Sequence, residues 1–589
     1  MRFSAVLFVF AACASTPDVL GDESSKRLQA MGNLGAVATA NPHATKAALA
    51  ILEAGGTAAE AAITAALVLG VTEPYSAGLG GGGFAMVHHA ATQKQYALDF
   101  RERAPSAAHR DLYLDEKGSL KPRASLDGWL AVAVPGTASG LEALYELKLH
   151  GGGTIPWATL VRPAIKLAAE GFTVTPLLHQ RIASRRQALA NDPEASRLFL
   201  PAGTPLEVGA TLVQPDLAET LGRFAEVGAL DWRSGVTAER IATATDAGGG
   251  ILTQADLAAY KVHWRAPITS SYRDHQIVSF PPPSSGGVHL AQMLQLIERI
   301  KVPSDALNAD FVHQRVEVMR RAYQDRARHL GDPDFYPVPT AGLLAKDHLD
   351  GLWASITPKA TPSNKLDNPQ PAGAQPARGA SSNESESTTH LTVVDRLGNA
   401  VAMTFTINYG FGAAVMAPGT GVLLNDEMDD FSSAPGKPNA YGLVGGEANS
   451  IAGGKTPLSS MTPTLVLDEE GRLKLAVGSP GGSTIITTVL QIILHVLDRN
   501  MPLAQAIAQP RVHHQWMPDC VFVDRKAKLG SLVGALKRKG HCVKSRRSMG
   551  NAHGVLVGKD GMLEAAADPR GEGHAGALVG PPSEADAKR

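Results

Sequence analysis

The chain has 589 residues, of which 44% are hydrophobic, so it is long enough to bury a large core. Its 60 glycines and 38 prolines predict many turns. The formal net charge is −1 and acidic and basic residues are mixed along the chain, so no basic face is expected and nucleic acid is excluded as a favoured partner.

Residues 1–20 are predicted to be a secretory signal peptide. Met1 and Arg2 precede an apolar run at 3–12, and small residues follow; the run is too short for a stable membrane span. The residues before Cys13 also resemble the end of a bacterial lipoprotein signal, although Phe10 stands where Leu is usual. Lipid attachment at Cys13 and ordinary cleavage nearby both stay open. We therefore expect export, with the bacterial periplasm as the destination.

The first half of the chain alternates strand and helix patterns. Strands are predicted at 35–39, 84–89, 96–101 and 277–280, and helices at 43–54, 57–71, 139–150, 157–170 and 308–327. The glycines at 78, 80 and 83 satisfy the dinucleotide-binding pattern, but a predicted helix precedes them where that fold needs a strand. We interpret them as a tight loop.

The residue composition of the chain changes at Thr388. From about Thr361 to Ser387 the residues are mostly polar or small, whereas 391–407 alternates polar and apolar residues around a Gly398-Asn399 turn, as in a hairpin. Cleavage before Thr388 would give it a free α-amine with a pKa of roughly 7.7–8.0, able to act as a base beside its own hydroxyl. A Thr at this position is most often only a strand residue, so the junction alone does not establish catalysis.

The second half predicts a strand and turn at 477–483, a helix at 484–497 and another at 529–539. Cys520 and Cys542, which remain after the signal, lie in strand-like pieces flanking the last helix; a disulfide and two free thiols both stay open. The adjacent pairs His88-His89 and His513-His514 do not have metal-ligand spacing, and no metal or organic cofactor is implied.

Many separate motifs then point to one family. They are LGGGGF at 79–84, DFRERAP at 99–105, SSGG at 284–287, LGDPDF at 330–335, TTH at 388–390, TFTIN at 404–408, NDEMDDF at 425–431, PLSSM at 457–461 and GSPGG at 478–482. With these motifs in this order, residues 35 to about 570 resemble γ-glutamyltransferases, also called glutathione hydrolases, of the N-terminal-nucleophile hydrolase group. The resemblance implies an α+β fold, a four-layer αββα sandwich.

The resemblance also implies self-cleavage between Ser387 and Thr388. The products would be a large subunit, 28–387, with a flexible C-terminal tail, and a small catalytic subunit, 388–589, which together form one αββα unit as a heterodimer. The segment before the cleavage site, 383–387, is looser and more acidic than the family pattern, which puts the maturation rate in doubt.

By resemblance, Thr388 is the nucleophile, Thr406 lies beside it, and Gly481 and Gly482 supply the backbone N–H groups of an oxyanion hole. The substrate's glutamyl end carries a carboxylate and an ammonium. Arg101, Ser459 and Ser460 would bind the carboxylate, Asn408, Glu427 and Asp430 the ammonium, and Tyr441 would belong to a lid loop at 439–449.

The expected activity is cleavage of glutathione and related γ-glutamyl compounds through an acyl-enzyme, with transfer to water, an amino acid or a peptide. The lid loop favours these small substrates. The alternatives are a cephalosporin or glutaryl acylase on the same scaffold, or an unprocessed protein that only binds γ-glutamyl ligands.

Overall fold

The computed structural model describes residues 27–149, 154–375, 387–432, 446–525, 527 and 529–580. The predicted signal peptide with Cys13, and Tyr441 of the predicted lid, lie outside the described residues. Among the described helices, none combines the length and the apolar character needed to cross a membrane.

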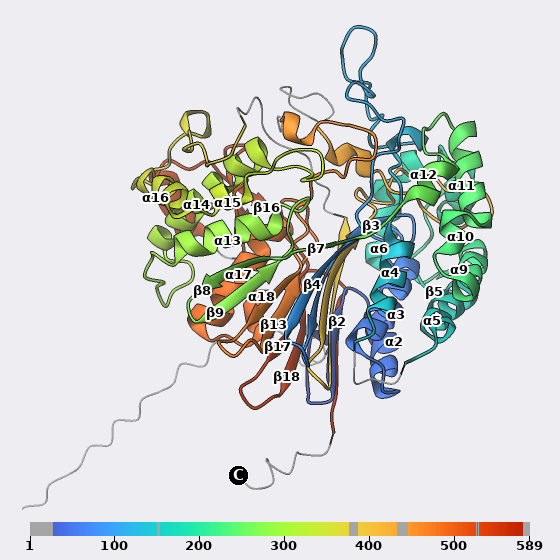
Figure 1. Ribbon diagram of the computed structural model, residues 1–589, viewed down its shortest axis with the longest axis horizontal. Helices are drawn as coiled ribbons and strands as arrows, with labels where there is room; N and C mark the ends of the chain where they lie inside the picture. Colours follow the sequence, from blue (N-terminus) through green and yellow to red (C-terminus); the bar gives the residue numbers. More distant parts are fainter. Residues whose placement is uncertain are drawn as a thin grey trace, which may run out of the picture.

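Two antiparallel sheets form the centre of the described structure (Figure 1). The first, called the β10 sheet, has the order β19 (His574–Leu578), β2 (Gly35–Thr39), β10 (Thr388–Asp395), β11 (Ala400–Thr406), β3 (Gly82–His89), β4 (Lys94–Asp99) and β7 (His263–Arg265). The second, called the β13 sheet, has the order β1 (Gln29–Gly32), β18 (Leu563–Ala567), β17 (His553–Val557), β13 (Leu473–Gly478), β12 (Thr464–Leu467), β9 (His275–Ser279) and β8 (Ile268–Tyr272).

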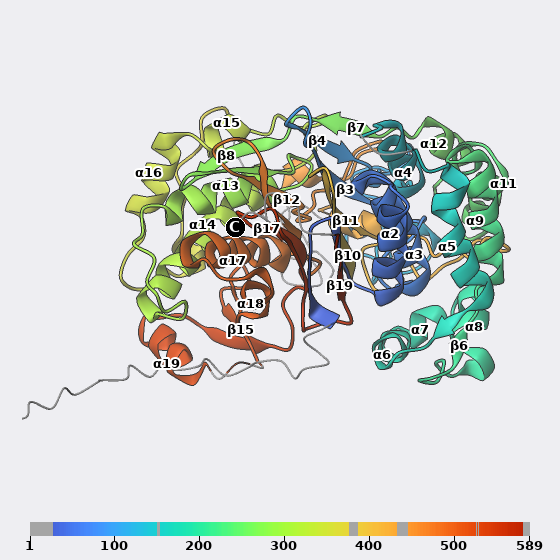
Figure 2. The same ribbon diagram turned by 90° about the horizontal axis from the view of Figure 1, so that it is seen from below.

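Helices cover the outer face of each sheet, as the view from below shows (Figure 2). The β10 sheet is covered by α2 (Pro42–Glu53) and α3 (Ala58–Thr72), backed by α4 (Thr137–Glu146), α5 (Trp157–Glu170), α6 (Pro176–Ser184), α7 (Arg186–Leu189), α8 (Pro193–Phe199), α9 (Pro215–Val227), α10 (Leu230–Arg233), α11 (Val236–Ala247) and α12 (Gln254–Ala259). On the side of the β13 sheet lie α13 (Gly286–Ile297), α14 (Ala309–His329), α15 (Thr340–Leu343), α16 (Lys346–Ala354), α17 (Thr484–Arg499) and α18 (Leu503–Ala508).

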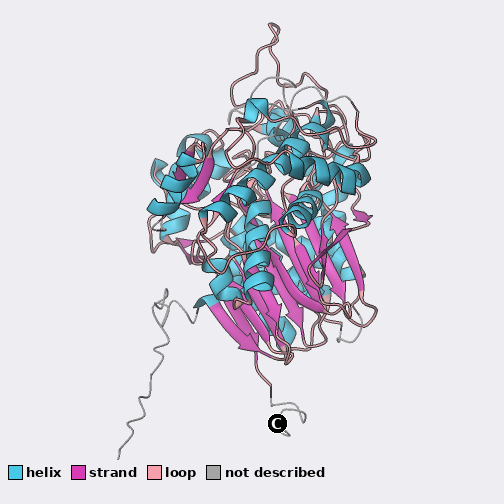
Figure 3. Cartoon of the chain, turned by 90° about the vertical axis from the view of Figure 1, so that its left-hand side faces the viewer, coloured by secondary structure: helices cyan, strands magenta, loops and turns pink. Residues whose placement is uncertain are grey.

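The alternation of side chains along the central strands builds the layers. On β3, Phe84 and Met86 enter the core between the two sheets, whereas Ala85 and Val87 enter the core beneath the helices. On β10, Leu391 and Val393 face those helices and Val394 faces the other sheet. Successive strand residues point to opposite faces, so a strand buried on both faces must be apolar at nearly every position. The predicted four-layer αββα sandwich is confirmed (Figure 3).

The hairpin predicted around the Gly398 turn is confirmed. β10 and β11 pair antiparallel from Thr388↔Thr406 to Val394↔Ala400, and Gly398 takes a φ of +84°, which glycine adopts without strain. The predicted strands at 35–39 and 84–89 and the helices at 43–54, 57–71 and 157–170 also form, with ends shifted by a few residues at most.

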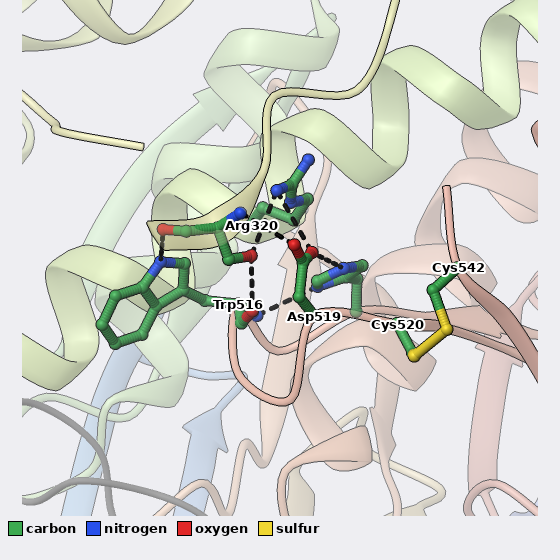
Figure 4. The surroundings of a disulfide bond; sticks show 7 residues. Arg320, Trp516, Asp519, Cys520 and Cys542 are labelled. Atoms are coloured by element: carbon green, nitrogen blue, oxygen red, sulfur yellow. Dashed lines mark hydrogen bonds and ion pairs between the residues drawn. A yellow bond between two sulfur atoms is a disulfide. The ribbon is translucent and has the colours of Figure 1, made fainter. Parts of the chain in front are cut away.

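The polar segment before Thr388 differs from the expectation at its beginning. Ser363, Leu366 and Asn368, around the short helix η3 (Ser363–Lys365), are buried against the body. Asp519 holds this segment by accepting a hydrogen bond from Ser363 N at 2.8 Å (Figure 4). Because the segment uses backbone and polar contacts with distant residues, its composition alone did not reveal them.

Cys520 and Cys542 form a disulfide (Figure 4). β15 (Val521–Asp524) and β16 (Val543–Arg546) pair in parallel with Val521 opposite Val543, and this register places the preceding cysteines 4.6 Å apart at their Cα atoms. The third strand of this small sheet is β14 (Val512–His513), and α19 (Gly530–Arg538) connects β15 to β16. The question that the sequence left open is therefore decided by strand register.

We expect Cys542→Ser to lower the free energy of unfolding by about 3 kcal/mol, because a disulfide closing a loop of this size restricts the unfolded chain by roughly that amount. The measurement is the urea midpoint of the oxidised wild type and the variant. Reduction of the wild type should reproduce the loss, and reduction of the variant should add nothing. If neither the substitution nor the reduction of the wild type changed the midpoint, a closed disulfide in the folded protein would be contradicted.

Candidate active site

Three groups at the start of β10 form a chain of hydrogen bonds. The Thr388 hydroxyl donates to Thr406 Oγ1 at 3.2 Å, and Thr406 Oγ1 in turn donates to the carbonyl oxygen of Ser387 at 2.9 Å. Asn408 N donates to Thr406 Oγ1 at 2.8 Å and fixes this hydroxyl in place. The carbonyl oxygen of the peptide bond before Thr388 thus accepts a hydrogen bond from Thr406. The same Thr406 hydroxyl accepts a hydrogen bond from Thr388.

The sheet explains why this end of β10 is accessible. β11 pairs along the whole strand from Thr388, whereas β2 on the other side begins to pair only at Leu391. Thr388 is therefore held firmly on one side and borders a cavity on the other, where Ala40 follows the end of β2. Its exposed fraction is 8%.

Gly481 and Gly482 lie in the turn between β13 and α17, on the side of Thr388 that faces the other sheet. Their φ values are +133° and +55°, and a Cβ on Gly481 would lie 2.5 Å from Thr484 Oγ1, so glycine is required by both conformation and space. Neither backbone N–H donates to another residue in the described part of the chain. Two backbone N–H groups without acceptors, in a tight turn beside the Thr388 hydroxyl, are the kind of donors that form an oxyanion hole.

Arg101 lies at the centre of a buried charge cluster. Its guanidinium contacts Glu427 Oε1 at 2.6 Å and Asp430 Oδ2 at 2.5 Å, and Glu102 Oε2 lies 3.7 Å away. Glu427 and Asp430 occupy the two ends of the 3₁₀ helix η4 (Glu427–Asp430), where residues three apart point the same way. The two carboxylates therefore lie on one side of this turn.

The cluster holds more negative than positive groups, because three carboxyl groups surround one guanidinium. Burial raises the pKa of Glu427 well above its ordinary value and raises the pKa of Glu102 to about 7, while Arg101 opposes both shifts. Burial thus favours the neutral acid at both residues, and a further cation bound among them would favour their charged forms. Arg101 is a predicted site residue and Glu102 is not, although both stand in the DFRERAP motif.

A small cavity of about 10 Å³ joins the charge cluster to the hydroxyls. Its wall contains eight of the predicted site residues: Arg101, Thr388, Thr406, Asn408, Glu427, Asp430, Ser459 and Gly482. Asn408 lies two residues beyond the end of β11 at Thr406, outside the strand, and has a φ of +70°. Ser460 stands between two residues of this wall in the sequence and is buried. Its hydroxyl has no hydrogen-bond partner among the described residues.

A second, larger cavity of about 380 Å³ borders Thr388 and Gly481. Glu73, at the end of α3, lies in its wall and accepts hydrogen bonds from Thr389 Oγ1 at 2.7 Å and from the Tyr75 hydroxyl at 3.2 Å. Burial raises the pKa of Glu73 to about 7. Sequence reasoning missed this residue, since a single Glu at a helix end carries no distinguishing pattern.

In the described residues, one group of side chains has the proximity of metal ligands: His313, Glu317 and His541. Their polar atoms already have partners, because His313 Nδ1 bonds His541 Nε2 at 2.8 Å and both Glu317 oxygens contact Arg320 and Arg321. Two arginines beside the only carboxylate oppose a divalent cation, so the cluster fits a polar core contact better than a metal site.

Comparison with known proteins identifies relatives over most of the chain. The γ-glutamyltranspeptidase family model matches residues 44–578. A glutathione hydrolase proenzyme of Escherichia coli is 41% identical over 539 residues, covering 91% of this chain and 90% of that protein.

Two solved structures have the same fold. A cephalosporin acylase from Bacillus halodurans superposes with a TM-score of 0.82 at 26% identity, covering 97% of this chain and all of that one. A γ-glutamyltranspeptidase from Helicobacter pylori superposes with a TM-score of 0.54 at 36% identity, covering 56% of this chain and 93% of that one. The chain thus belongs to the γ-glutamyltranspeptidase family, within the N-terminal-nucleophile hydrolase fold.

Proposed function

We propose that this protein cleaves itself between Ser387 and Thr388 and then acts as a γ-glutamyltransferase and glutathione hydrolase with Thr388 as nucleophile. The observation that carries the proposal is the position of Thr406, whose hydroxyl contacts both Thr388 Oγ1 and the Ser387 carbonyl oxygen. Family membership and the proenzyme name of the E. coli relative support it.

Self-cleavage begins with attack of Thr388 Oγ1 on the carbonyl carbon of Ser387. The hydrogen bond from Thr406 stabilises negative charge that develops on the carbonyl oxygen. The C–N bond breaks as the Thr388 nitrogen takes up the proton that Oγ1 loses, which leaves an ester between the Ser387 carbonyl and Thr388 Oγ1. Water hydrolyses this ester. The products are one chain that ends at Ser387 and one that begins at Thr388, and each supplies strands to both sheets.

In the mature protein the freed α-amine of Thr388 accepts the hydroxyl proton, since an unperturbed α-amine has a pKa of roughly 7.7–8.0. Thr388 Oγ1 attacks the γ-glutamyl carbonyl, and the N–H groups of Gly481 and Gly482 stabilise the oxyanion. The leaving amine departs with a proton, and water or an acceptor amine then attacks the acyl-enzyme. The products are free glutamate or a new γ-glutamyl amide.

The charge cluster supports a γ-glutamyl rather than a glutaryl group. A glutamyl end brings one carboxylate for Arg101 and one ammonium for Glu427 and Asp430, so it adds no net charge to the excess of carboxyl groups around Arg101. Ser459 and Asn408 complete the polar wall. A glutaryl group, the alternative suggested by the acylase fold relative, brings only the carboxylate and would add to the negative excess.

Export is part of the same proposal. The residue pattern of the first 20 positions and the Cys520–Cys542 disulfide both fit an oxidising compartment such as the periplasm. The intact mass of the mature protein reports signal removal, any lipid on Cys13 and backbone cleavage in one measurement.

We expect Thr388→Ala to abolish both self-cleavage and turnover, because it removes the only hydroxyl that both steps use. Denaturing gels and release of aniline from a γ-glutamyl anilide measure the two effects. Thr388→Ser keeps a hydroxyl at the same atom and should retain both. Wild-type turnover by Thr388→Ala would refute the nucleophile assignment.

Thr406→Val should slow self-cleavage by about 10²-fold or more, since loss of one oxyanion donor typically costs that much. Valine preserves the size and branching of this buried side chain, so the fold should persist. Thr406→Ser retains the donor and should mature at close to the wild-type rate. The time course of the full-length band gives the rates, and equal rates for the valine and serine variants would show that the hydroxyl has no role.

The mature enzyme should prefer γ-glutamyl anilide over glutaryl anilide by at least about 10²-fold in kcat/KM. The two substrates differ only in the ammonium group, and hydrogen bonds to charged groups contribute about 1.5–3 kcal/mol each. Glutamyl and glutaryl anilides release the same chromophore, so one assay compares them. A preference for the glutaryl compound would establish the acylase reading instead.

A further inference from the structure

The two cavities described above meet at the nucleophile. Thr388 lies in the wall of both, Gly482 lines the small one beside Arg101, and Gly481 lines the large one. A substrate whose reacting carbonyl lies at Thr388, with its acyl part toward Arg101, must therefore direct its leaving group into the large cavity. At about 380 Å³, this cavity has the size of a small-molecule site.

The wall of the large cavity is rich in arginine. It contains Arg181 from α6, Arg546 and Arg547 from the end of β16, and Arg570. Arg570 is neutralised by Asp524 at 2.6 Å and Asp568 at 3.1 Å, and Arg546 stacks on Phe522 at 5.0 Å from the ring centre.

Arg181 and Arg547 differ from the other two. Within the described residues neither one forms an ion pair, and Arg181 Nε is buried without a hydrogen-bond partner, with its guanidinium 5.7 Å from the centre of the Tyr75 ring. Arg181 is partly buried and Arg547 is exposed. An unpaired guanidinium in a cavity wall favours binding of an anion, above all a carboxylate that accepts two parallel hydrogen bonds.

The carboxyl group in this wall does not cancel the arginines. Glu73 is a single buried carboxyl group that accepts hydrogen bonds from Thr389 and Tyr75; burial raises its pKa to about 7, and these hydrogen bonds and Arg181 oppose the shift. The large cavity is thus electropositive, opposite in sign to the Arg101 cluster on the other side of Thr388.

We propose that the large cavity is a subsite for a peptide C-terminal carboxylate, with Arg181 and Arg547 as its ligands. The inference rests on the proposed function, in which the leaving group of glutathione is a dipeptide. A dipeptide spans roughly 7 Å when extended, which carries its carboxylate from Thr388 into this cavity. An acceptor peptide takes the place of the leaving group in the transfer reaction, so the same arginines select acceptors that end in a free carboxylate.

The test compares glutathione with its C-terminal carboxamide, which differs only in charge at the far end of the leaving group. For the wild type we expect a kcat/KM ratio of acid to amide of at least about tenfold. Arg181→Gln and Arg547→Gln should each reduce this ratio severalfold, and the double variant should bring it to within about twofold of one. Arg181→Lys keeps the charge and should fall between the wild type and Arg181→Gln.

Arg186→Gln is the matched control. Arg186 lies on α7 outside the cavity wall and donates to Gly203 O, so its loss should leave the acid-to-amide ratio at the wild-type value. A wild-type ratio near one, or a ratio unaffected by both cavity substitutions, would overturn the subsite. If Arg181→Gln does not mature, the wild-type ratio and Arg547→Gln still decide the question. Failure of the proposed function is a separate outcome, in which the wild type cleaves neither compound.

Discussion

The hydrogen bond from Thr406 to the carbonyl of Ser387 is the contact on which the site depends. It requires Thr406 to lie directly opposite Thr388, and that register is set by seven successive β10–β11 pairs in the middle of a sheet. A shift of β11 by one residue would turn the Thr406 hydroxyl to the face opposite that of Thr388. The apolar residues that alternate with them enter two different cores, so the burial of Leu391, Val393 and Val394 holds the register.

Charge is arranged in opposite senses on the two sides of Thr388. On the Arg101 side, three carboxyl groups face one guanidinium, all of them buried, and the arrangement is costly without a ligand because burial penalises charged carboxylates. On the other side the unpaired arginines line an open cavity. A γ-glutamyl peptide, with an ammonium and carboxylate at one end and a carboxylate at the other, is complementary to this distribution.

The two parts of the chain on either side of Thr388 are interleaved rather than adjacent. In the β10 sheet, β10 and β11 from the second part lie between β2 and β3 from the first, and in the β13 sheet β12 lies against β9. Figure 1 shows the same mixture of early and late segments in both layers. Cleavage of one peptide bond would leave these ladders and their cores intact, so two chains can remain one folded unit.

The sequence by itself determined the central strands, the main helices and the hairpin at Gly398, because periodic burial and tight turns depend on residues that are close in the chain. Its motifs also identified the family. It also named the eight residues that the small cavity brings together, through motifs scattered over 400 positions. Only the tertiary structure decided that Cys520 reaches Cys542, that Glu102 and Glu73 join the site, and that Arg181 and Thr388 line the same cavity. These facts depend on strand register and on the packing of distant segments, and no local pattern of residue types encodes the distance between two such segments.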